Sequence, residues 1–524
     1  DLDIPSCWRR TDETHLFVRT SLGKRSFAPS RHRVACYCPS EMNVNGKKVI
    51  HWFRRDFRIA DNTALTAAVA AGDEVIPVYI VSDWSGSHQW TGPARQEFLC
   101  GALASLAKNL ESIGGRLIIR RGDAVAELEK LVAEAGATAI FANRDPDPFG
   151  RSVEARLEET LSAKGIELSL HKDVCIHERD EVLTGQGTVF RVFTPYSKVW
   201  FGLPKPDPLP APKRISTPEG ISSLPLPQIS DWGGVPSASF AAIPEPGERA
   251  ARERLKAFVS GPMASYGDQR DIPSLSGTSH LSQDLRFGLL SPRQIYAAAK
   301  RVEEGLPPEG RKNTMKFLAE IVWREFYMQL LWHYPQLLEQ EFNPTWRGME
   351  WPGLSGRPDA AEAFQRWCEG KTGFPIIDAA MRQLAATGWM HNRARMITAM
   401  FLTKDLHLDW RLGESFFMRS LVDGEIASNN GGWQWSAGTG ADAAPYFRIQ
   451  NPWSQTKRYD PEGLYIRKWV PELRNVSNSS FLEAPPDGRA IAPGYPAPML
   501  DHSTERDRTL DLFARHKASR VSRA

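Results

Sequence analysis

The chain has 524 residues, of which 41% are hydrophobic and 24% are charged, and its formal net charge is +3. This is the composition of an ordinary globular protein with enough length for two or more domains. No apolar run approaches the ~20 residues of a membrane-spanning helix, and with so small a net charge any nucleic-acid binding must come from a local basic patch. The six cysteines have no paired metal-binding spacing, so we expect reduced thiols and no metal site.

Residues 1–46 differ from the rest of the chain. They mix Arg, Ser and Cys without hydrophobic periodicity, and the first methionine is Met42. Basic, Ser-rich segments are typical of some transit peptides, but acidic residues such as Asp12 and Glu13 argue against that interpretation. We therefore expect a disordered segment or a misplaced start site.

Short strands and helices alternate between residues 47 and 180. Strands rich in Val and Ile are expected at 48–53, 74–81, 116–120, 138–143 and 166–171, with helices at 61–72, 93–113, 123–135 and 150–164. This alternation predicts an α/β domain with a doubly wound parallel sheet covered by helices on both faces. The first strand leads into RRDFR at 54–58 and not into a Gly-rich fingerprint, so the layout is Rossmann-like without a signal for NAD.

A long linker is expected over residues 181–247. Its stretch 204–246 contains eleven prolines and little periodicity, which is typical of a stiff connector. Beyond it the pattern is largely helical, so we expect a second, all-α domain over 248–517 that closes with a short helix at about 505–517. Residues 518–524 would form a tail.

Two segments of the second domain combine apolar residues with many hydrogen-bond donors. Residues 389–402 have helical spacing, and residues 423–448 are rich in Gly and Asn before Trp433 and Trp435. Burying so many donors is costly unless a polar ligand binds there, so we predict an aromatic-lined pocket for a large planar ligand. Arg395 and Asp423 are opposite charges in these segments and are expected to pair.

Two further patterns point toward the same pocket. Glu320, Trp323, Arg324 and Tyr327 have the spacing of one helical face, which suits a pocket wall that stacks on and hydrogen-bonds a flat ligand. A plain Glu–Arg ion pair four residues apart is the alternative. The hydroxyl-rich run 277–282 could hold an anion at a helix N-terminus, although ordinary helix caps look the same.

Several motifs occur in an order that resembles the photolyase/cryptochrome family, and most of all the bacterial class I cyclobutane pyrimidine dimer photolyases. They are WFRRDFR at 52–58, the run 278–282, EIVWREFY from 320, GKTGFP from 370, WMHNRARM from 389, DGEIASNNGGWQW from 423 and DAAPYFRIQNP from 442. The similarity runs from about 47 to 517. It implies an enzyme that repairs pyrimidine dimers in DNA by light-driven electron transfer from reduced FAD.

The resemblance implies which residues hold the FAD. The phosphates would lie against Tyr266, Thr278, Ser279, His280, Leu281 and Ser282. Other parts of the cofactor would lie along Phe317, Glu320, Arg324, Asn392, Gly424 and Glu425. The Arg395–Asp423 pair would lie beside the isoalloxazine, and Asn429 would face its N5 atom. The family usually has Asp where Glu425 stands, which changes one contact.

The resemblance also implies a lesion pocket and a DNA-binding surface. Catalytic roles fall to Glu320, Trp323, Asn392, Met396, Asn429 and Trp435. DNA would be bound by Arg270, Glu320, Trp323, Tyr327, Asn392, Arg393 and Trp435. A dimer flipped out of the duplex would find aromatic walls and polar groups matched to the pyrimidine edges.

Three tryptophans usually carry an electron from the protein surface to oxidised flavin in this family. Trp433 and Trp410 match the inner two. The usual outer position is Arg357 here, so Trp351, the nearest earlier tryptophan, is the expected terminus. A folate antenna is not expected, because Gly150 stands where folate-binding members carry Glu; a deazaflavin, a flavin or no antenna stays open.

Two other functions share this fold. A signalling cryptochrome would be a photoreceptor, but its plant-type members usually have Asp where Asn429 stands. A (6-4) photolyase would use a pair of histidines, whereas Asn392 and Met396 occupy that helix here. We expect a monomeric enzyme of the bacterial cytoplasm, associated with the nucleoid when it binds DNA.

Overall fold

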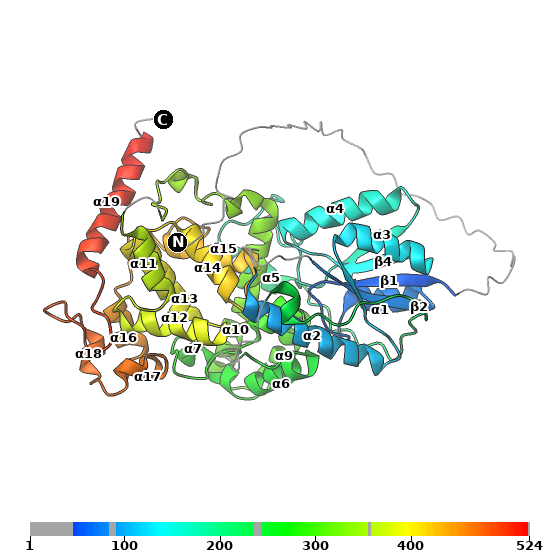
Figure 1. The fold of residues 1–524 in the computed structure, drawn as a ribbon, viewed down its shortest axis with the longest axis horizontal. Helices are drawn as coiled ribbons and strands as arrows, with labels where there is room; N and C mark the ends of the chain where they lie inside the picture. Colours follow the sequence, from blue (N-terminus) through cyan, green and yellow to red (C-terminus); the bar gives the residue numbers. More distant parts are fainter. Residues whose placement is uncertain (1–45, 83–90, 234–242, 355–357, 522–524) are drawn as a thin grey trace. The chain divides into compact units, whose positions relative to one another are not determined.

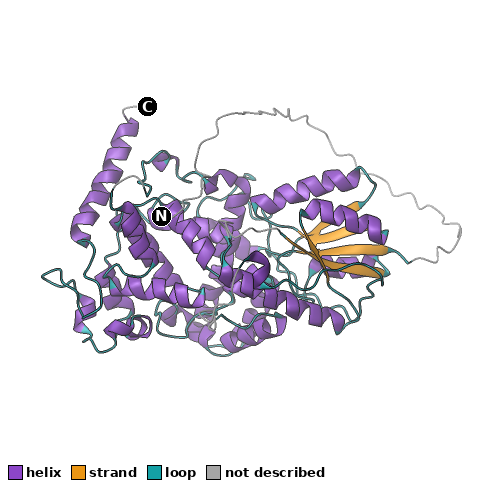
Figure 2. Cartoon of the chain, in the orientation of Figure 1, coloured by secondary structure: helices purple, strands orange, loops and turns teal. Residues whose placement is uncertain are grey.

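The structure is a computed structural model that describes residues 46–82, 91–233, 243–354 and 358–521 (Figure 1). Residues 1–45 and Arg357 lie outside the described part. The expectation of a disordered segment or a misplaced start site therefore falls on residues that the structure does not describe. The chain from Gly46 onward forms one compact unit. Figure 2 shows one sheet, with helices and loops making up the rest.

The five strands form a parallel sheet in the order β3-β2-β1-β4-β5. They are β1 (Lys48–Phe53), β2 (Glu74–Val81), β3 (Ile118–Arg121), β4 (Ala139–Asn143) and β5 (Glu167–His171). In the central strand, Ile50 is paired with Ile76 on one side and Ile140 on the other. The predicted doubly wound parallel sheet is therefore confirmed, and β3 begins two residues later than expected.

Helices cover both faces of this sheet. They are α1 (Thr63–Ala71), α2 (Pro93–Glu111), α3 (Ala124–Ala135) and α4 (Pro148–Ser162). Val49 and Phe53 of β1 pack into the core that contains residues of α1 and α2, whereas Ile50 and Trp52 pack into the core shared with α3 and α4. Side chains alternate across a strand, so an almost wholly apolar β1 serves two cores.

The expected linker is not extended throughout. It contains α5 (Phe193–Gly202) and the short helix η2 (Ile229–Trp232). Tyr196 and Trp200 of α5 are fully buried in a core that also contains Phe326. An aromatic face of α5 therefore holds this segment against the helical domain.

The helical domain surrounds the 26-residue helix α10 (Pro308–His333). Before it come α6 (Glu248–Val259), η4 (Pro262–Ser265), α7 (Tyr266–Gln269), α8 (Ser282–Arg286) and α9 (Pro292–Glu303). After it come η5 (Pro335–Leu338), η6 (Pro344–Trp346), α11 (Ala360–Cys368), α12 (Pro375–Thr387), α13 (Asn392–Met400), η7 (Phe401–Asp405), α14 (Trp410–Ser420) and α15 (Ile426–Ala437). The chain closes with α16 (Pro452–Tyr459), α17 (Leu464–Trp469), η8 (Pro471–Leu473), α18 (Ser479–Leu482) and α19 (His502–Val521).

Two helices differ from the sequence-based expectation. The helix expected at 389–402 begins at Asn392, because His391 caps it by accepting a hydrogen bond from the Arg393 backbone, and it continues into the π-helical turn η7. The final helix, α19, extends beyond 505–517 at both ends. No helix among the described residues combines the length and apolar character needed to cross a bilayer.

The RRDFR motif joins the α/β domain to the helical domain. Arg58 donates hydrogen bonds of 2.6 and 2.8 Å to the two carboxylate oxygens of Asp173. Arg293 at the start of α9 reaches the same Asp173 at 2.7 Å and Asp61 at 3.1 Å. All four side chains are buried, so removing any one of them would leave an uncompensated charge in the interior.

Candidate active site

Four helices, together with the residues just before the last of them, hold most of the predicted site residues. Helix α10 packs against both α7 and α15, and α13 packs against α15. These contacts bring the segments 266–270, 317–327, 392–396 and 423–435 into one region of the helical domain. The predicted convergence of distant sequence motifs is therefore present in the fold.

Glu320 on α10 forms an ion pair with Arg270, at 2.5 Å between Oε1 and Nη1. The alternative expectation of a simple Glu320–Arg324 pair is wrong, because Arg324 instead donates to the Val174 carbonyl oxygen at 2.7 Å. Burial raises the pKa of Glu320 and Arg270 opposes that rise. The Glu320 side chain is still 33% exposed, so a ligand from outside can reach its carboxylate.

Trp323 has one face covered by protein. Phe193 of α5 stacks on it with ring centroids 3.6 Å apart and an interplanar angle of 5°. Tyr327, one turn further along α10, lies 5.5 Å away at a 30° tilt. A tryptophan clamped in this way is a rigid wall whose orientation is set before any ligand arrives.

Asn392 and Met396 lie on the first turns of α13, where Asn392 is exposed and Met396 half-buried. Arg393 between them donates to Asp271 at 2.7 Å and lies over the ring of Tyr459 at 4.7 Å. Burial lowers the pKa of the capping His391 to about 4, so this imidazole stays neutral and can keep accepting the bond that starts the helix.

The predicted pair of Arg395 and Asp423 is present, with 2.8 Å between Nη2 and Oδ2. Arg395 also donates to the Met390 carbonyl oxygen at 2.8 Å, which fixes the guanidinium. Asp423 is buried, and its other oxygen, Oδ1, has no hydrogen-bond partner among the described residues. A buried acceptor without a protein partner is a position where a polar ligand group fits.

Asn429 on α15 is oriented by its neighbour helix. Its amide nitrogen donates to the Glu414 carbonyl oxygen on α14 at 3.0 Å. The next residue, Asn430, donates to the Glu414 carboxylate at 2.9 Å and to the Leu337 carbonyl oxygen at 3.0 Å. Because its nitrogen is used in this way, the side-chain oxygen of Asn429 is the atom that can accept a hydrogen bond from a ligand.

Glu425 lies in a buried charge cluster at the edge of the α/β domain. Its carboxylate contacts Arg55 and lies 3.7 Å from Arg286 and 3.6 Å from Arg324. Arg55 also reaches Asp147 at 2.9 Å. The side chains of Arg324 and Glu425, both expected along the FAD, thus bind each other and the first domain.

The hydroxyl-rich run lies in the loop before α8. His280 has a positive φ of 49° and its ring lies 4.2 Å from that of Trp389. Leu281 is buried, and the buried hydroxyl oxygen of Thr278 has no hydrogen-bond partner among the described residues. Because α8 has only five residues, hydroxyl and backbone groups of this loop, more than a helix dipole, would bind an anion.

Tyr266 and Phe317 form an aromatic edge near this loop. Their ring centroids lie 5.5 Å apart at an angle of 77°, and both residues are buried. Together with Thr278 and Asp423, they offer apolar contact and unsatisfied acceptors in one domain. These residues fit a large cofactor with both aromatic and polar parts.

The three tryptophans expected as a relay lie in one region. Trp433 is buried against Phe417, with centroids 5.0 Å apart, and against the α14 backbone at Gly413. Trp410, the first residue of α14, is fully buried. Its indole nitrogen and that of the half-buried Trp351 both donate to the same oxygen, Oε1 of Glu341, at 3.3 and 3.2 Å.

Sequence reasoning missed several of the groups that organise this site. Glu341, Asp271 and Glu414 each hold a predicted residue, and Arg55 ties Glu425 to the first domain. The sequence could have indicated only Asp271, because this charged residue directly follows the predicted site residue Arg270. The other partners are too distant in sequence to be found by spacing.

Comparisons with known proteins agree with this geometry. Residues 49–213 match the family model described as DNA photolyase, and residues 317–515 match the one described as the FAD-binding domain of DNA photolyase. A curated relative from Vibrio cholerae, described as deoxyribodipyrimidine photo-lyase, is 40% identical over 473 residues, which is 88% of this chain and 98% of the relative.

Solved structures give the same result. A bacterial class III photolyase from Agrobacterium tumefaciens superposes with a TM-score of 0.83 at 37% identity, covering 91% of this chain and 99% of that one. A cryptochrome from Synechocystis has a TM-score of 0.80 at 27% identity, covering 89% and 99%.

An α/β domain followed by a helical domain that matches an FAD-binding model defines a two-domain flavoprotein. The identity to the Vibrio cholerae relative extends over almost its whole length, well beyond a shared fold. The chain belongs to the DNA photolyase family.

Proposed function

We propose that this protein is a deoxyribodipyrimidine photo-lyase, which uses light to split cyclobutane pyrimidine dimers in DNA. The observation that carries this conclusion is the 40% identity to an enzyme of that name over 98% of its length. FAD in its reduced form, when bound, supplies the electron that opens the cyclobutane ring and then receives it back. The residues of the chain bind, orient and polarise the groups around it.

The lesion pocket is formed by α10, α13 and α15. In this proposal Trp323 and Trp435 give the flipped dimer apolar walls, and Glu320, Asn392 and Met396 contact it between those walls. Because Phe193 already clamps one face of Trp323, only the other face is available to the pyrimidines. Glu320 accepts hydrogen bonds from pyrimidine N–H groups, and Asn392 can match either a carbonyl or an N–H group.

The cofactor is held in part by two buried oxygen atoms that have no hydrogen-bond partner among the described residues. Thr278 and Asp423 each present a buried oxygen, and the loop 278–282 with Tyr266 takes the phosphates. The side-chain nitrogen of Asn429 is held by the Glu414 carbonyl oxygen, which turns the side-chain oxygen toward the role of acceptor in a contact to N5. Gly424 and the backbone of Glu425 contribute from the segment that precedes α15, while the Glu425 side chain anchors this segment to Arg55.

The DNA-binding surface includes Arg270 and Arg393. In this structure Arg270 is paired with Glu320, and Arg393 with Asp271. Both arginines are only partly buried, so they can exchange or share these partners with phosphate groups. Tyr327 supports the same wall of α10.

Trp433, Trp410 and Trp351 form the path for electrons that reduce the bound FAD. Trp433 belongs to α15, which carries Asn429, and Trp351 is half-buried toward the outside of the domain. Supporting Trp351 as the outer member is its hydrogen bond to the oxygen that also binds Trp410.

A folate antenna does not suit this chain. A Cβ atom at Gly150 would lie only 2.4 Å from Cγ of Asp145, which is held by Arg55 at 3.2 Å. The larger Glu of folate-binding members would therefore require this buried cluster to move. We propose that any antenna is of another chemical type, and that the enzyme works as a monomer in the bacterial cytoplasm, where its DNA substrate lies.

Lesion choice tests this function. Reduced, FAD-loaded protein is illuminated with two duplexes that differ only in carrying a thymine cyclobutane dimer or a (6-4) photoproduct. We expect repair of the first and none of the second, because Asn392 and Met396 replace the histidine pair that a (6-4) enzyme uses. Repair of the second duplex alone would refute the proposed specificity, and binding of FAD with repair of neither would favour a photoreceptor.

A further inference from the structure

Glu341 lies in the loop between η5 and η6, next to the proposed electron path. It is only 4% exposed. Its Oε1 atom accepts hydrogen bonds from the indole nitrogens of Trp410 and Trp351, at 3.3 and 3.2 Å. Burying a carboxylate costs free energy, even when it is hydrogen-bonded. One indole hydrogen bond would be enough to orient either ring, so the sharing of one oxygen by two indoles indicates a further role for this charge.

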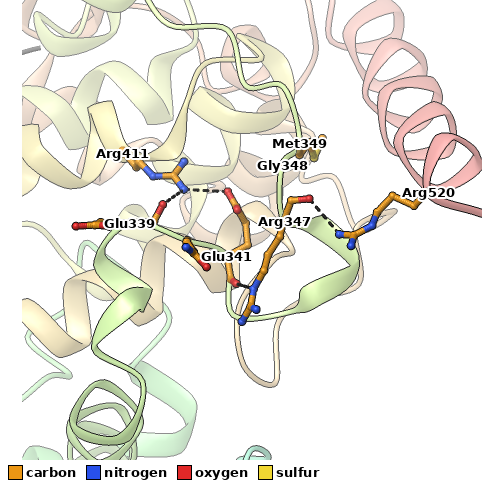
Figure 3. A pocket seen from close by; sticks show the side chains of 8 residues that line it. Glu339, Glu341, Arg347, Gly348, Met349, Arg411 and Arg520 are labelled. Carbon is orange, nitrogen blue, oxygen red and sulfur yellow. Dashed lines mark hydrogen bonds and ion pairs between the residues drawn. The ribbon is translucent and has the colours of Figure 1, made fainter. Parts of the chain in front are cut away.

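The Glu341 carboxylate also binds Arg411. Nη2 of Arg411 lies 3.1 Å from the same Oε1 and 2.6 Å from the Glu339 carbonyl oxygen, while Nη1 lies 3.2 Å from Asp409 (Figure 3). The guanidinium carbon of Arg411 also lies 4.4 Å from the centre of the Trp410 ring. A positive charge over this ring opposes its oxidation, and Glu341 is the negative group placed to offset that effect.

A cavity of about 460 Å³ connects this carboxylate with the surface. It is lined by Glu341, Arg347, Arg411 and Arg520, and its rim includes the exposed residues Glu339 and Gln340. Figure 3 shows the Glu341 and Arg411 side chains directed toward each other beside this space. Water in such a cavity could receive a proton from Glu341, whereas the fully buried Trp410 has no exposed surface of its own.

We propose that Glu341 is the proton acceptor of the tryptophan relay. This inference rests on the proposed function, in which Trp410 and Trp351 supply electrons by way of Trp433 to oxidised flavin. Removal of one electron from an indole makes its N–H group strongly acidic. The N–H proton then moves to Oε1 of Glu341, which leaves a neutral indole radical and a neutral carboxylic acid.

The atoms and charges balance in this step. One electron leaves the indole toward the flavin, one proton crosses a hydrogen bond that already exists, and no atom is gained or lost by the pair. Loss of the proton stops the electron from returning, because the neutral radical is a much weaker oxidant than the charged one. Since both indoles donate to the same oxygen, Glu341 serves whichever of Trp410 and Trp351 carries the charge. The carboxylic acid afterwards releases its proton into the cavity.

Time-resolved absorption spectroscopy tests this role, because charged and neutral indole radicals absorb at different wavelengths. FAD-loaded oxidised protein is excited by a light pulse, and the lifetime of the charged radical is measured in wild type and in Glu341→Gln. The amide keeps an oxygen that accepts the indole hydrogen bonds but is not basic. We expect the charged radical to live at least tenfold longer and the yield of reduced flavin to fall.

Two further variants complete the experiment. Glu341→Asp restores a basic carboxylate and is expected to shorten the lifetime again. Glu339→Gln removes a carboxylate from the rim of the same cavity and should behave as wild type. Melting temperatures of the FAD-loaded proteins verify that each variant folds.

The outcomes separate this inference from the function on which it rests. A wild-type lifetime in a folded Glu341→Gln protein would overturn the role of Glu341 and leave the relay intact. Equal effects of the Glu339 and Glu341 changes would also overturn it, because only a general charge effect would remain. If wild type itself forms no indole radical, the relay assignment fails and this inference with it, while light-driven repair by reduced protein would still stand.

Discussion

Glu414 offers a direct test of how the part of α15 that carries Asn429 is stabilised. This residue is 3% exposed, its carboxylate accepts from Asn430 at 2.9 Å, and its carbonyl oxygen accepts from Asn429 at 3.0 Å. Burial raises its pKa from 4.5 to about 8. In the folded state the carboxyl group is therefore protonated over a pH range in which it is ionised in the unfolded chain.

The sign of the pH effect follows from proton binding. Between about pH 4.5 and pH 8 the folded state binds more protons at Glu414 than the unfolded state does. The stability that Glu414 contributes is therefore complete below this range and is lost as the pH rises through it. One pH unit in this range is worth about 1.4 kcal/mol, and because the group is half titrated in one of the two states at each end, the loss across the range is roughly 4 kcal/mol. Glu414→Gln has no such proton and should lack this slope.

Urea unfolding of both proteins at pH 5, 6.5 and 8 measures the difference. We expect Glu414→Gln to gain in unfolding free energy relative to wild type as the pH rises, by up to about 4 kcal/mol at pH 8. Glu158→Gln, an exposed carboxylate on α4, controls for the change in net charge. Parallel pH profiles for wild type and Glu414→Gln would refute the idea that Glu414 is kept neutral by burial.

Three other changes test the site. In Gly413→Ala the new Cβ would lie 2.0 Å from Cη2 of Trp433, so we expect a loss of about 1–3 kcal/mol of stability and slower photoreduction of FAD; an unchanged melting temperature would contradict this packing. Glu320→Ala should retain FAD but slow repair by about 100-fold or more, because Arg270 loses its partner and the pyrimidine an acceptor; wild-type repair rates would remove Glu320 from the mechanism. Arg393→Ala should weaken binding to damaged DNA and reduce the slope of log affinity against log salt by about one, as measured by fluorescence anisotropy, and an unchanged slope would place Arg393 off the phosphate backbone.

The sheet and its helices could be predicted from sequence because their signals are local. Strands such as 48–53 and 74–81 are mostly apolar and rich in Val and Ile, and the observed bounds agree with them. Helix α5 was missed because its burial depends on Phe326, far away in sequence. The start of α13 depends on a hydrogen bond to the His391 side chain, which hydrophobic periodicity does not reveal.

The site shows the same division between local and distant information. Motifs placed Glu320, Asn429 and the tryptophans in one region, but their partners came only from the fold. The carboxylate of Glu341 is one acidic group in the sequence EQEF at 339–342, and nothing local distinguishes it from Glu339. Only the folded chain shows that one of the two is buried between indoles and the other is exposed at the rim.

Glu425 stands where the family usually has Asp, and the structure shows what the longer side chain contacts. From the sequence alone, we expected only that one contact to the cofactor would change. In the structure the longer side chain reaches Arg55 and lies near Arg286 and Arg324, so it links the segment before α15 to the α/β domain. The pattern identified the position, but the partner that Glu425 contacts most closely, Arg55, lies 370 residues away in the chain.

The most direct measurement of the central claim is repair of a single thymine dimer in an oligonucleotide by purified protein with reduced FAD, under blue light and in darkness. The recovery of intact thymines is followed by the return of their ultraviolet absorbance. We expect recovery in the light, none in darkness, and none in light without protein. Recovery that is equal in light and darkness, or absent in both while the protein binds the damaged strand, would contradict the assignment as a light-driven photo-lyase.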